Sequence, residues 1–234
     1  MICAIMQPHY FPWSGYFSLI NKSQIFVFLD DSQFSKASWH NRNIILANKK
    51  KKWITVPTKK SKLATIISEK LIDHSFNWNL PQARTILQTY SKHPFIRDIS
   101  ELMDYFLELK PENLSSLNID IIRFISKKIN LNTNFLLSSE FGFSSKRTKK
   151  IVDILNVICA TEYLSPEGSK NYLEEDNFKE LSNIKLSFNN YIPKEYPQKF
   201  LNKFVGNLSI IDVIANLGWK NAEMYVKGNL DFYN

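Results

Sequence analysis

The sequence predicts an α/β fold: a Rossmann-like, mostly parallel sheet flanked by helices, with an inserted helical layer. Two short apolar runs, residues 3–6 and 25–30, have the length and composition of buried strands. The intervening segment 14–21 is long enough for about two helical turns, which completes a strand–helix–strand unit. The length of 234 residues favours a single domain over 1–234, in which residues 80–130 form a helical subregion.

Later segments continue the alternation of strands and helices. Ser209 and Asp212 have the spacing of a helix N-terminal box, and Gly218 suits the position just past that helix. Apolar residues at helical spacing predict further helices over 83–90, 99–109, 117–129 and 148–158. Short apolar runs predict further strands, at 53–56, 66–72, 135–137, 162–164 and 184–188.

The composition is that of a globular protein, with 44% hydrophobic residues. No apolar run approaches the roughly 20 residues of a membrane span, and the N-terminus lacks the pattern of a secretory signal. Cys3 and Cys159 therefore read as reduced thiols, and we expect a cytoplasmic location. No Cys/His cluster has zinc-like spacing, so no metal is expected.

The net charge of +8 comes largely from lysine-rich runs within 49–52, 59–62 and 146–150. Solvated surface lysines account for such runs. The runs are not interleaved with aromatic residues that could stack on bases, which argues against a nucleic-acid partner. A small substrate that carries phosphate fits this charge at least as well.

Residues 7–16, QPHYFPWSGY, are an unusual loop because two prolines, a glycine, a histidine and four aromatic residues follow directly on a strand. Ligands of α/β folds bind at the carboxyl ends of the strands, so His9 is a candidate general base. Another interpretation is that His9 is a hydrogen-bonded core residue and that the rings are packing. In the binding interpretation the loop contributes Gln7, Tyr10, Trp13 and Tyr16 to the site.

Asp30 and Asp31 end the second predicted strand. If the first two strands are parallel, both acids lie at the same sheet edge as the 7–12 loop. A carboxylate there could orient the imidazole of His9 and raise its basicity, or act as the base itself. The alternative is a carboxylate that caps a turn.

A polar cluster, SWHNRN, spans residues 38–43. Arg42 offers a planar fork suited to carboxylate or phosphate, and Asn41 and Asn43 offer amide groups on either side. Trp39 adds an aromatic surface to the same candidate binding segment. A structural pair between Arg42 and an aspartate would also explain the cluster.

The segment SPEGSKNYL, residues 165–173, follows another predicted strand. Backbone N–H groups at Gly168 and Ser169 could bind an anion ahead of a short helix. Ser165 and Tyr172 complete this second candidate binding segment.

Five motifs taken together, QPHYFPWSGYFSLI, FVFLDDSQFSK, SWHNRN, YLSPEGSKNYL and NLSIIDVIANLG, resemble the WbqC-like protein family. The similarity runs in order through nearly the whole chain and is weakest over residues 97–147. The start of the chain also resembles nucleotidylyl-transferase-like domains, which carry histidines where Trp13 and Tyr16 stand here. That second likeness bears on the fold. The polar positions that match the family pattern are Gln7, His9, Asp30, Asp31, Asn41, Arg42, Asn43, Ser165, Ser169 and Tyr172.

The resemblance implies a role in bacterial surface-polysaccharide (O-antigen) biosynthesis. Some members of the family are suggested to transfer glycine, or a similar acyl group, to the amino group of an amino sugar. The expected partner is then a nucleotide-linked amino sugar. The acyl donor stays open between a carrier-protein thioester, a coenzyme A thioester and an adenylate.

Three functions remain to be compared. The first is the acyl or aminoacyl transferase, which needs a base for the attacking amine and donors for the oxyanion. The second is a non-catalytic module that binds a sugar nucleotide or a carrier protein. The third, nucleic-acid binding, has the least support from the sequence.

Overall fold

The fold is described from a computed structural model for residues 1–230. Five parallel strands form the main sheet, in the order β5-β2-β1-β6-β7. The two apolar runs predicted first are neighbours in it, paired from Cys3 with Ile25 to Met6 with Phe28. The strands are β1 (Ile2–Met6), β2 (Ile25–Phe28), β5 (Asn134–Leu137), β6 (Glu162–Pro166) and β7 (Lys185–Asn189).

Helices cover both faces of this sheet. Alternate side chains of each strand point to opposite faces, so Cys3, Ile5 and Val27 pack against one helical layer and Ala4 and Phe26 against another. The first layer holds α5 (Arg147–Val157), α6 (Lys170–Glu175) and α7 (Phe178–Leu181). The second begins with α1 (Ser14–Asn21) and α4 (Leu114–Lys128). The predicted fold class, a helix-flanked parallel sheet, is confirmed.

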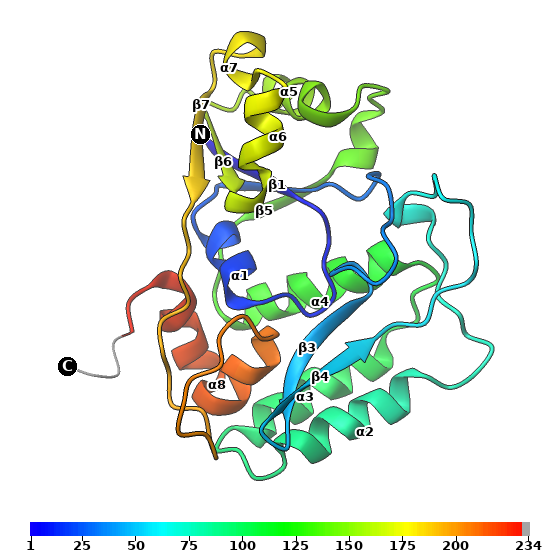
Figure 1. Ribbon diagram of the computed structural model, residues 1–234, viewed down its shortest axis with the longest axis vertical. Coiled ribbons are helices and arrows are strands. Elements are labelled where there is room, and N and C mark those ends of the chain that lie inside the picture. The colour runs from blue at the N-terminus through cyan, green and yellow to red at the C-terminus, as the bar shows by residue number, and fades with distance from the viewer. Residues whose placement is uncertain (231–234) are drawn as a thin grey trace.

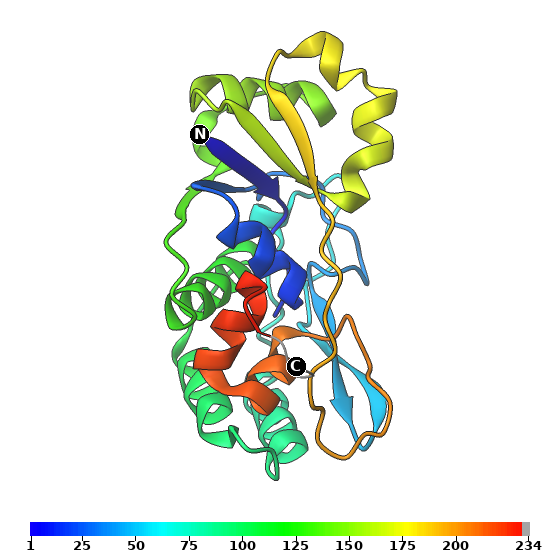
Figure 2. The same ribbon diagram turned by 90° about the vertical axis from the view of Figure 1, so that its left-hand side faces the viewer.

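An antiparallel hairpin and further helices build the other end of the molecule (Figures 1 and 2). The hairpin strands β3 (Arg42–Ala47) and β4 (Lys50–Thr55) pair from Arg42 with Thr55 to Ala47 with Lys50. The helices are α2 (Asn79–Tyr90), α3 (Ile96–Glu108) and α8 (Ile210–Lys227). Short 3₁₀ turns complete the chain: η1 (Ile67–Glu69), η2 (Ser138–Phe141) and η3 (Glu167–Ser169).

Three predicted elements differ in detail. Residues 66–72 form η1 and isolated bridges rather than a strand, because Ile67 and Ile72 are both buried although alternation would place them on opposite faces. Strand β4 starts at Lys50 and includes the lysine run, which a hairpin edge strand tolerates because its outer side meets water. At Gly218 (φ 72°) the helix kinks and then continues to Lys227. A side chain there would overlap the ring of Phe95.

No helix within residues 1–230 has both the length and the apolar character that crossing a membrane requires.

Candidate functional site

A cavity of about 1290 Å³ lies at the carboxyl edge of the parallel sheet. Residues that follow β1, β2, β6 and β7 line it, together with the start of α5. Since β2 and β7 are three strand spacings apart in the sheet, the cavity extends over roughly 14 Å along this edge. Ligands of open α/β sheets bind in this position.

The cavity brings together about half of the residues that the sequence singled out. They come from the loop after β1, from the end of β2 and from the turn after β6. These lining residues are Gln7, His9, Trp13, Tyr16, Asp31, Gly168, Ser169 and Tyr172.

A chain of hydrogen bonds fixes Gln7 at the centre of this edge. The backbone N–H of Ser35 donates to Nδ1 of His40 (3.2 Å), so Nε2 of His40 carries the proton and donates to Oε1 of Gln7 (2.9 Å). Nε2 of Gln7 donates to Oγ of Ser32 (2.9 Å), which in turn donates to the carbonyl oxygen of Leu29 (2.9 Å). In this chain of hydrogen bonds each group acts either as a donor or as an acceptor, with no alternative assignment. The Gln7 amide therefore has a fixed orientation.

His9 is half-buried beside this chain, with its ring 5.5 Å from that of Tyr16 and 5.8 Å from that of His40 between centroids. Among the described residues, its ring nitrogens make no hydrogen bond. Burial, and to a smaller extent the neighbouring His40, lowers the pKa of His9 to about 3. The imidazole is therefore neutral at neutral pH and keeps a free lone pair.

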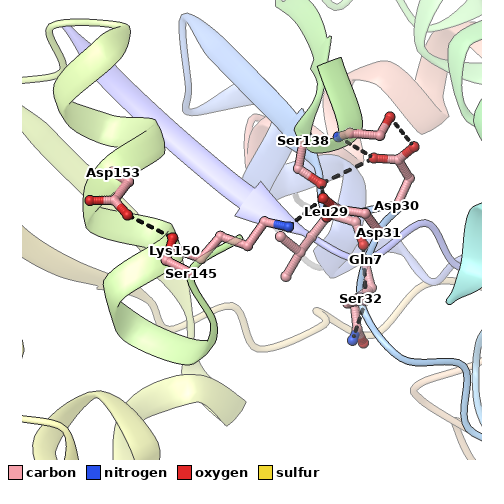
Figure 3. A network of polar contacts seen from close by, with 10 residues as sticks. Gln7, Leu29, Asp30, Asp31, Ser32, Ser138, Ser145, Lys150 and Asp153 are labelled. Atoms are coloured by element: carbon pink, nitrogen blue, oxygen red, sulfur yellow. Dashed lines mark hydrogen bonds and ion pairs between the residues drawn. The ribbon is translucent and has the colours of Figure 1, made fainter. Parts of the chain in front are cut away.

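Asp31 forms an ion pair with Lys150 of α5 at the β2 end of the cavity (Figure 3). The two side chains are 15% and 12% exposed. The other carboxylate oxygen of Asp31 lies 2.5 Å from Oγ of Ser138. Both carboxylate oxygens are thus engaged, one by an ammonium group and one by a hydroxyl.

Asp30 lies on the other side of the chain and is buried away from the cavity lining. Its carboxylate accepts hydrogen bonds from the backbone N–H of Ser139 (3.0 Å) and from the Ser139 hydroxyl (2.7 Å). Ser138 Oγ also lies 3.0 Å from it. Asp30 therefore ties the end of β2 to the turn after β5.

The 38–43 cluster lies outside the cavity lining, because its side chains connect backbone segments. Asn43 donates to the carbonyl oxygens of Tyr10 (3.0 Å) and Phe11 (2.9 Å), and Asn41 donates to that of Val56 (3.2 Å). The side chain of Tyr10 is itself fully buried in the core. Within this cluster, the residue that reaches the cavity network is His40, through Gln7.

Arg42 and Trp39 are on the hairpin surface. The guanidinium of Arg42 lies over the ring of Trp53 at 4.0 Å, and the rings of Trp39 and Trp53 are 5.6 Å apart. Arg42 therefore stacks on an aromatic ring rather than pairing with an aspartate.

Trp13 forms an aromatic wall at the β7 end of the cavity. Its ring meets that of Tyr191 edge to face, with centroids 5.4 Å apart. The indole lies directly over Gly15, where any side chain would overlap it. Nδ2 of Asn189, in turn, is 3.4 Å from the carbonyl oxygen of Gly15, which connects α1 to the end of β7.

The turn after β6 closes the cavity between these two ends. Ser165 and Ser169 share a short hydrogen bond, and the Ser169 hydroxyl contacts the carbonyl oxygen of Pro166 at 2.6 Å. Gly168 is exposed beside them. Tyr172 lines the cavity from α6, and burial raises the pKa of its phenol.

The sequence reasoning missed several lining residues, of which Lys146, Lys150 and Tyr191 have the clearest chemistry. Lys146 makes no ion pair with any described residue, so its ammonium group can bind an anionic ligand. No side chain caps the first turn of α5 beside it. The basic run at 146–150 was the available signal, but its spacing alone does not show that it faces Asp31, the aspartate in the turn after β2.

Comparisons with known proteins agree with this geometry. The model of the WbqC-like protein family matches residues 7–224, which span both ends of the cavity. This chain belongs to the WbqC-like protein family. The resemblance expected from the five motifs is thereby confirmed.

A WbqC-like relative is found in Mycobacterium tuberculosis (strain ATCC 25618 / H37Rv), where it bears the name "Uncharacterized protein Rv1507c". It is 31% identical to this chain over 217 residues, which cover 92% of this chain and 93% of that protein. No solved structure matches the chain.

Proposed function

We propose that this WbqC-like protein transfers an acyl or aminoacyl group, such as glycine, to the amino group of an amino sugar or sugar nucleotide in surface-polysaccharide biosynthesis. One observation carries the proposal. The cavity at the sheet edge places an imidazole without a hydrogen-bond partner among the described residues, His9, in the same enclosure as the Asp31–Lys150 pair.

The reaction needs a proton acceptor and positive charge. The amine nitrogen attacks the acyl carbon, the new C–N bond forms, and the bond from that carbon to the thiol or phosphate leaving group breaks. His9, neutral at neutral pH, accepts the proton that the amine loses as it attacks and passes it to the leaving group. Lys150 and Lys146 supply positive charge for the oxyanion or for the diphosphate of a sugar nucleotide.

The size of the cavity supports two substrates. Pockets for single drug-sized ligands have volumes of roughly 300–1000 Å³, and this cavity has about 1290 Å³. Its aromatic wall, Trp13 and Tyr191, suits a sugar or base ring. Its other end, at Lys150, suits the acyl and phosphate groups.

Mass spectrometry tests the proposal. The purified protein is incubated with an amino-sugar nucleotide and, in parallel reactions, with a glycyl or acetyl thioester of coenzyme A, a carrier-protein thioester, or ATP with glycine. We expect the sugar nucleotide to gain the mass of one acyl group, and His9→Gln to lower the rate at least tenfold with little change in affinity. Failure of the protein to bind any amino-sugar nucleotide would rule the proposal out.

One observation favours a non-catalytic binding module as the second candidate. The pKa of His9 is low, and both oxygens of Asp31 are engaged, so neither group is a strong base. A binding module predicts that His9→Gln and Asp31→Asn lower ligand affinity and product formation in the same proportion. An enzyme predicts a variant that binds normally and turns over slowly.

A further inference from the structure

The positive charge of this protein is concentrated in one segment. Residues 32–68 hold nine of the 30 lysines and arginines and none of the 22 acidic residues. The rest of the chain therefore carries 21 cations against 22 acids. The whole excess charge of +8 arises from a segment of fewer than 40 residues.

Eight of these nine cations are exposed on the surface. Lys36, the lysines at 49–52 and those at 59, 60 and 62 are all exposed. Across residues 1–230, no ion pair joins any of the segment's nine cations to a carboxylate. Strand β4 and the chain that follows it run along one side of the molecule, on the right in Figure 1. Their positive charges therefore add up on that side.

Large apolar side chains are exposed in the same segment. Trp39 and Trp53 are 45% and 44% exposed, and Leu63, next to Lys62, is 87% exposed. Tryptophan and lysine together are typical of protein surfaces that lie in the headgroup region of a bilayer. A leucine on a projecting loop adds a group that the acyl boundary can bury.

The aromatic geometry argues against single-stranded nucleic acid on this surface. Base stacking needs a free ring face, and Arg42 already occupies one of the two faces of Trp53, at 4.0 Å, while Trp39 packs beside the same ring. Stacking also leaves the exposed Leu63 without a role. Lipid phosphates, by contrast, need exposed cations without fixed geometry.

We propose that this surface, residues 36–63, binds peripherally to an anionic lipid bilayer. The lysines contact lipid phosphates, and Trp39, Trp53 and Leu63 enter the headgroup region. The chain that follows Leu63 continues into the cavity lining through Ala64 and Ile66. Binding at this surface would thus hold the cavity close to the membrane. This inference does not depend on the proposed transferase activity.

Vesicle co-sedimentation of the full chain tests the proposal. The probes are phosphatidylcholine vesicles with and without phosphatidylglycerol, at low and at raised salt. One variant carries Lys50→Gln, Lys51→Gln and Lys52→Gln. Its matched control carries Lys127→Gln, Lys179→Gln and Lys220→Gln, which removes the same charge from exposed positions on α4, α7 and α8, outside the segment.

We expect binding to the phosphatidylglycerol vesicles only, and weaker binding as salt rises. Each lysine near an anionic surface strengthens binding about fivefold, so the first variant should bind up to about 100-fold more weakly. The affinity of the control variant for these vesicles should stay within about threefold of the wild-type affinity, because its substituted lysines lie away from the bilayer. The tryptophan fluorescence emission should shift to shorter wavelength when the protein binds the vesicles. The shift should be smaller in the double variant Trp39→Phe/Trp53→Phe.

Three outcomes would overturn the inference. The first is equal sedimentation with both kinds of vesicle at low salt. The second is an equal loss of binding in the two triple variants. The third is tighter binding to single-stranded RNA than to the vesicles, with the same loss in the β4 variant, which would assign the surface to nucleic acid.

Discussion

Asp31 and Lys150 show how a single contact positions the candidate site. The two residues are 119 positions apart in sequence, and their ion pair joins the end of β2 to the first turns of α5. Both side chains are largely shielded from water, so the loss of either partner leaves a charge that the cavity solvates poorly.

A double-mutant cycle measures this contact. Asp31→Asn, Lys150→Met and the double variant should give a coupling energy of about 1–3 kcal/mol in urea unfolding. The comparable pair Lys149–Asp153 lies on the exposed side of the same helix, with Lys149 69% exposed. The double-mutant cycle of this exposed pair should give a coupling energy of about 0–1 kcal/mol. Equal coupling in the two cycles would contradict the account.

The contacts of individual side chains also explain which of the predicted site residues line the cavity and which do not. Asp30 and Asp31 both lie in the turn that follows β2, and of the two carboxylates that of Asp31 lines the cavity. The sequence did not show which one, because the selection depends on Ser139 and Lys150, more than 100 positions away. The asparagines at 41 and 43 satisfy backbone carbonyls 15 and 33 positions away, which local spacing cannot reveal.

At the scale of elements, two loops bury histidines side by side, and this burial gives stability a pH dependence. Burial lowers the pKa of His9 to about 3 and that of His40 to about 4, from a usual value of 6.5. Between pH 6.5 and these values the unfolded chain binds more protons than the folded one. Stability is therefore fully present above about pH 6.5 and is lost as the pH falls.

We expect the free energy of unfolding to fall by up to about 2.5 kcal/mol per pH unit between pH 6 and pH 4, because two histidines contribute about 1.4 kcal/mol each at most. His9→Gln and His40→Gln should each make this slope shallower. His74→Gln, at an exposed position, should leave it unchanged. Denaturant titrations between pH 4 and 7 check this, and an identical slope in all four proteins would show that the two histidines titrate normally.

The start of α1 forms the aromatic wall only because residue 15 is a glycine. Gly15→Ala should displace the indole of Trp13, destabilise the protein by about 1–3 kcal/mol and weaken ligand binding at that end. Gly168→Ala is the matched control, since it lines the same cavity and has open space around its Cα. Thermal unfolding compares the two variants. Equal melting temperatures would show that the Trp13–Gly15 contact does not hold the wall.

At the scale of the whole molecule, the sequence predicted the architecture more fully than the cavity. Strands and helices each leave a local pattern of apolar residues in the sequence: a short apolar run for a buried strand, and apolar residues at helical spacing for a helix. The alternation of strands and helices could therefore be predicted from the sequence directly. The parallel pairing of β1 with β2 then placed the 7–12 loop and Asp31 at one edge. The walls of the cavity that face this edge could not be predicted from local sequence patterns. They come from α5 and from the chain after β7, whose approach depends on the order β5-β2-β1-β6-β7.

The transferase account rests on the cavity, and the comparison of two adjacent lysines tests it most directly. The measurement is the rate of amide formation on an amino-sugar nucleotide, followed by mass spectrometry at a temperature where both variants are folded. Lys150, in the cavity, should be required, so Lys150→Met should lose at least tenfold in rate. Lys149→Met, one residue away and facing solvent, should match wild type. Equal rates for the two variants would contradict the assignment of the reaction to this cavity.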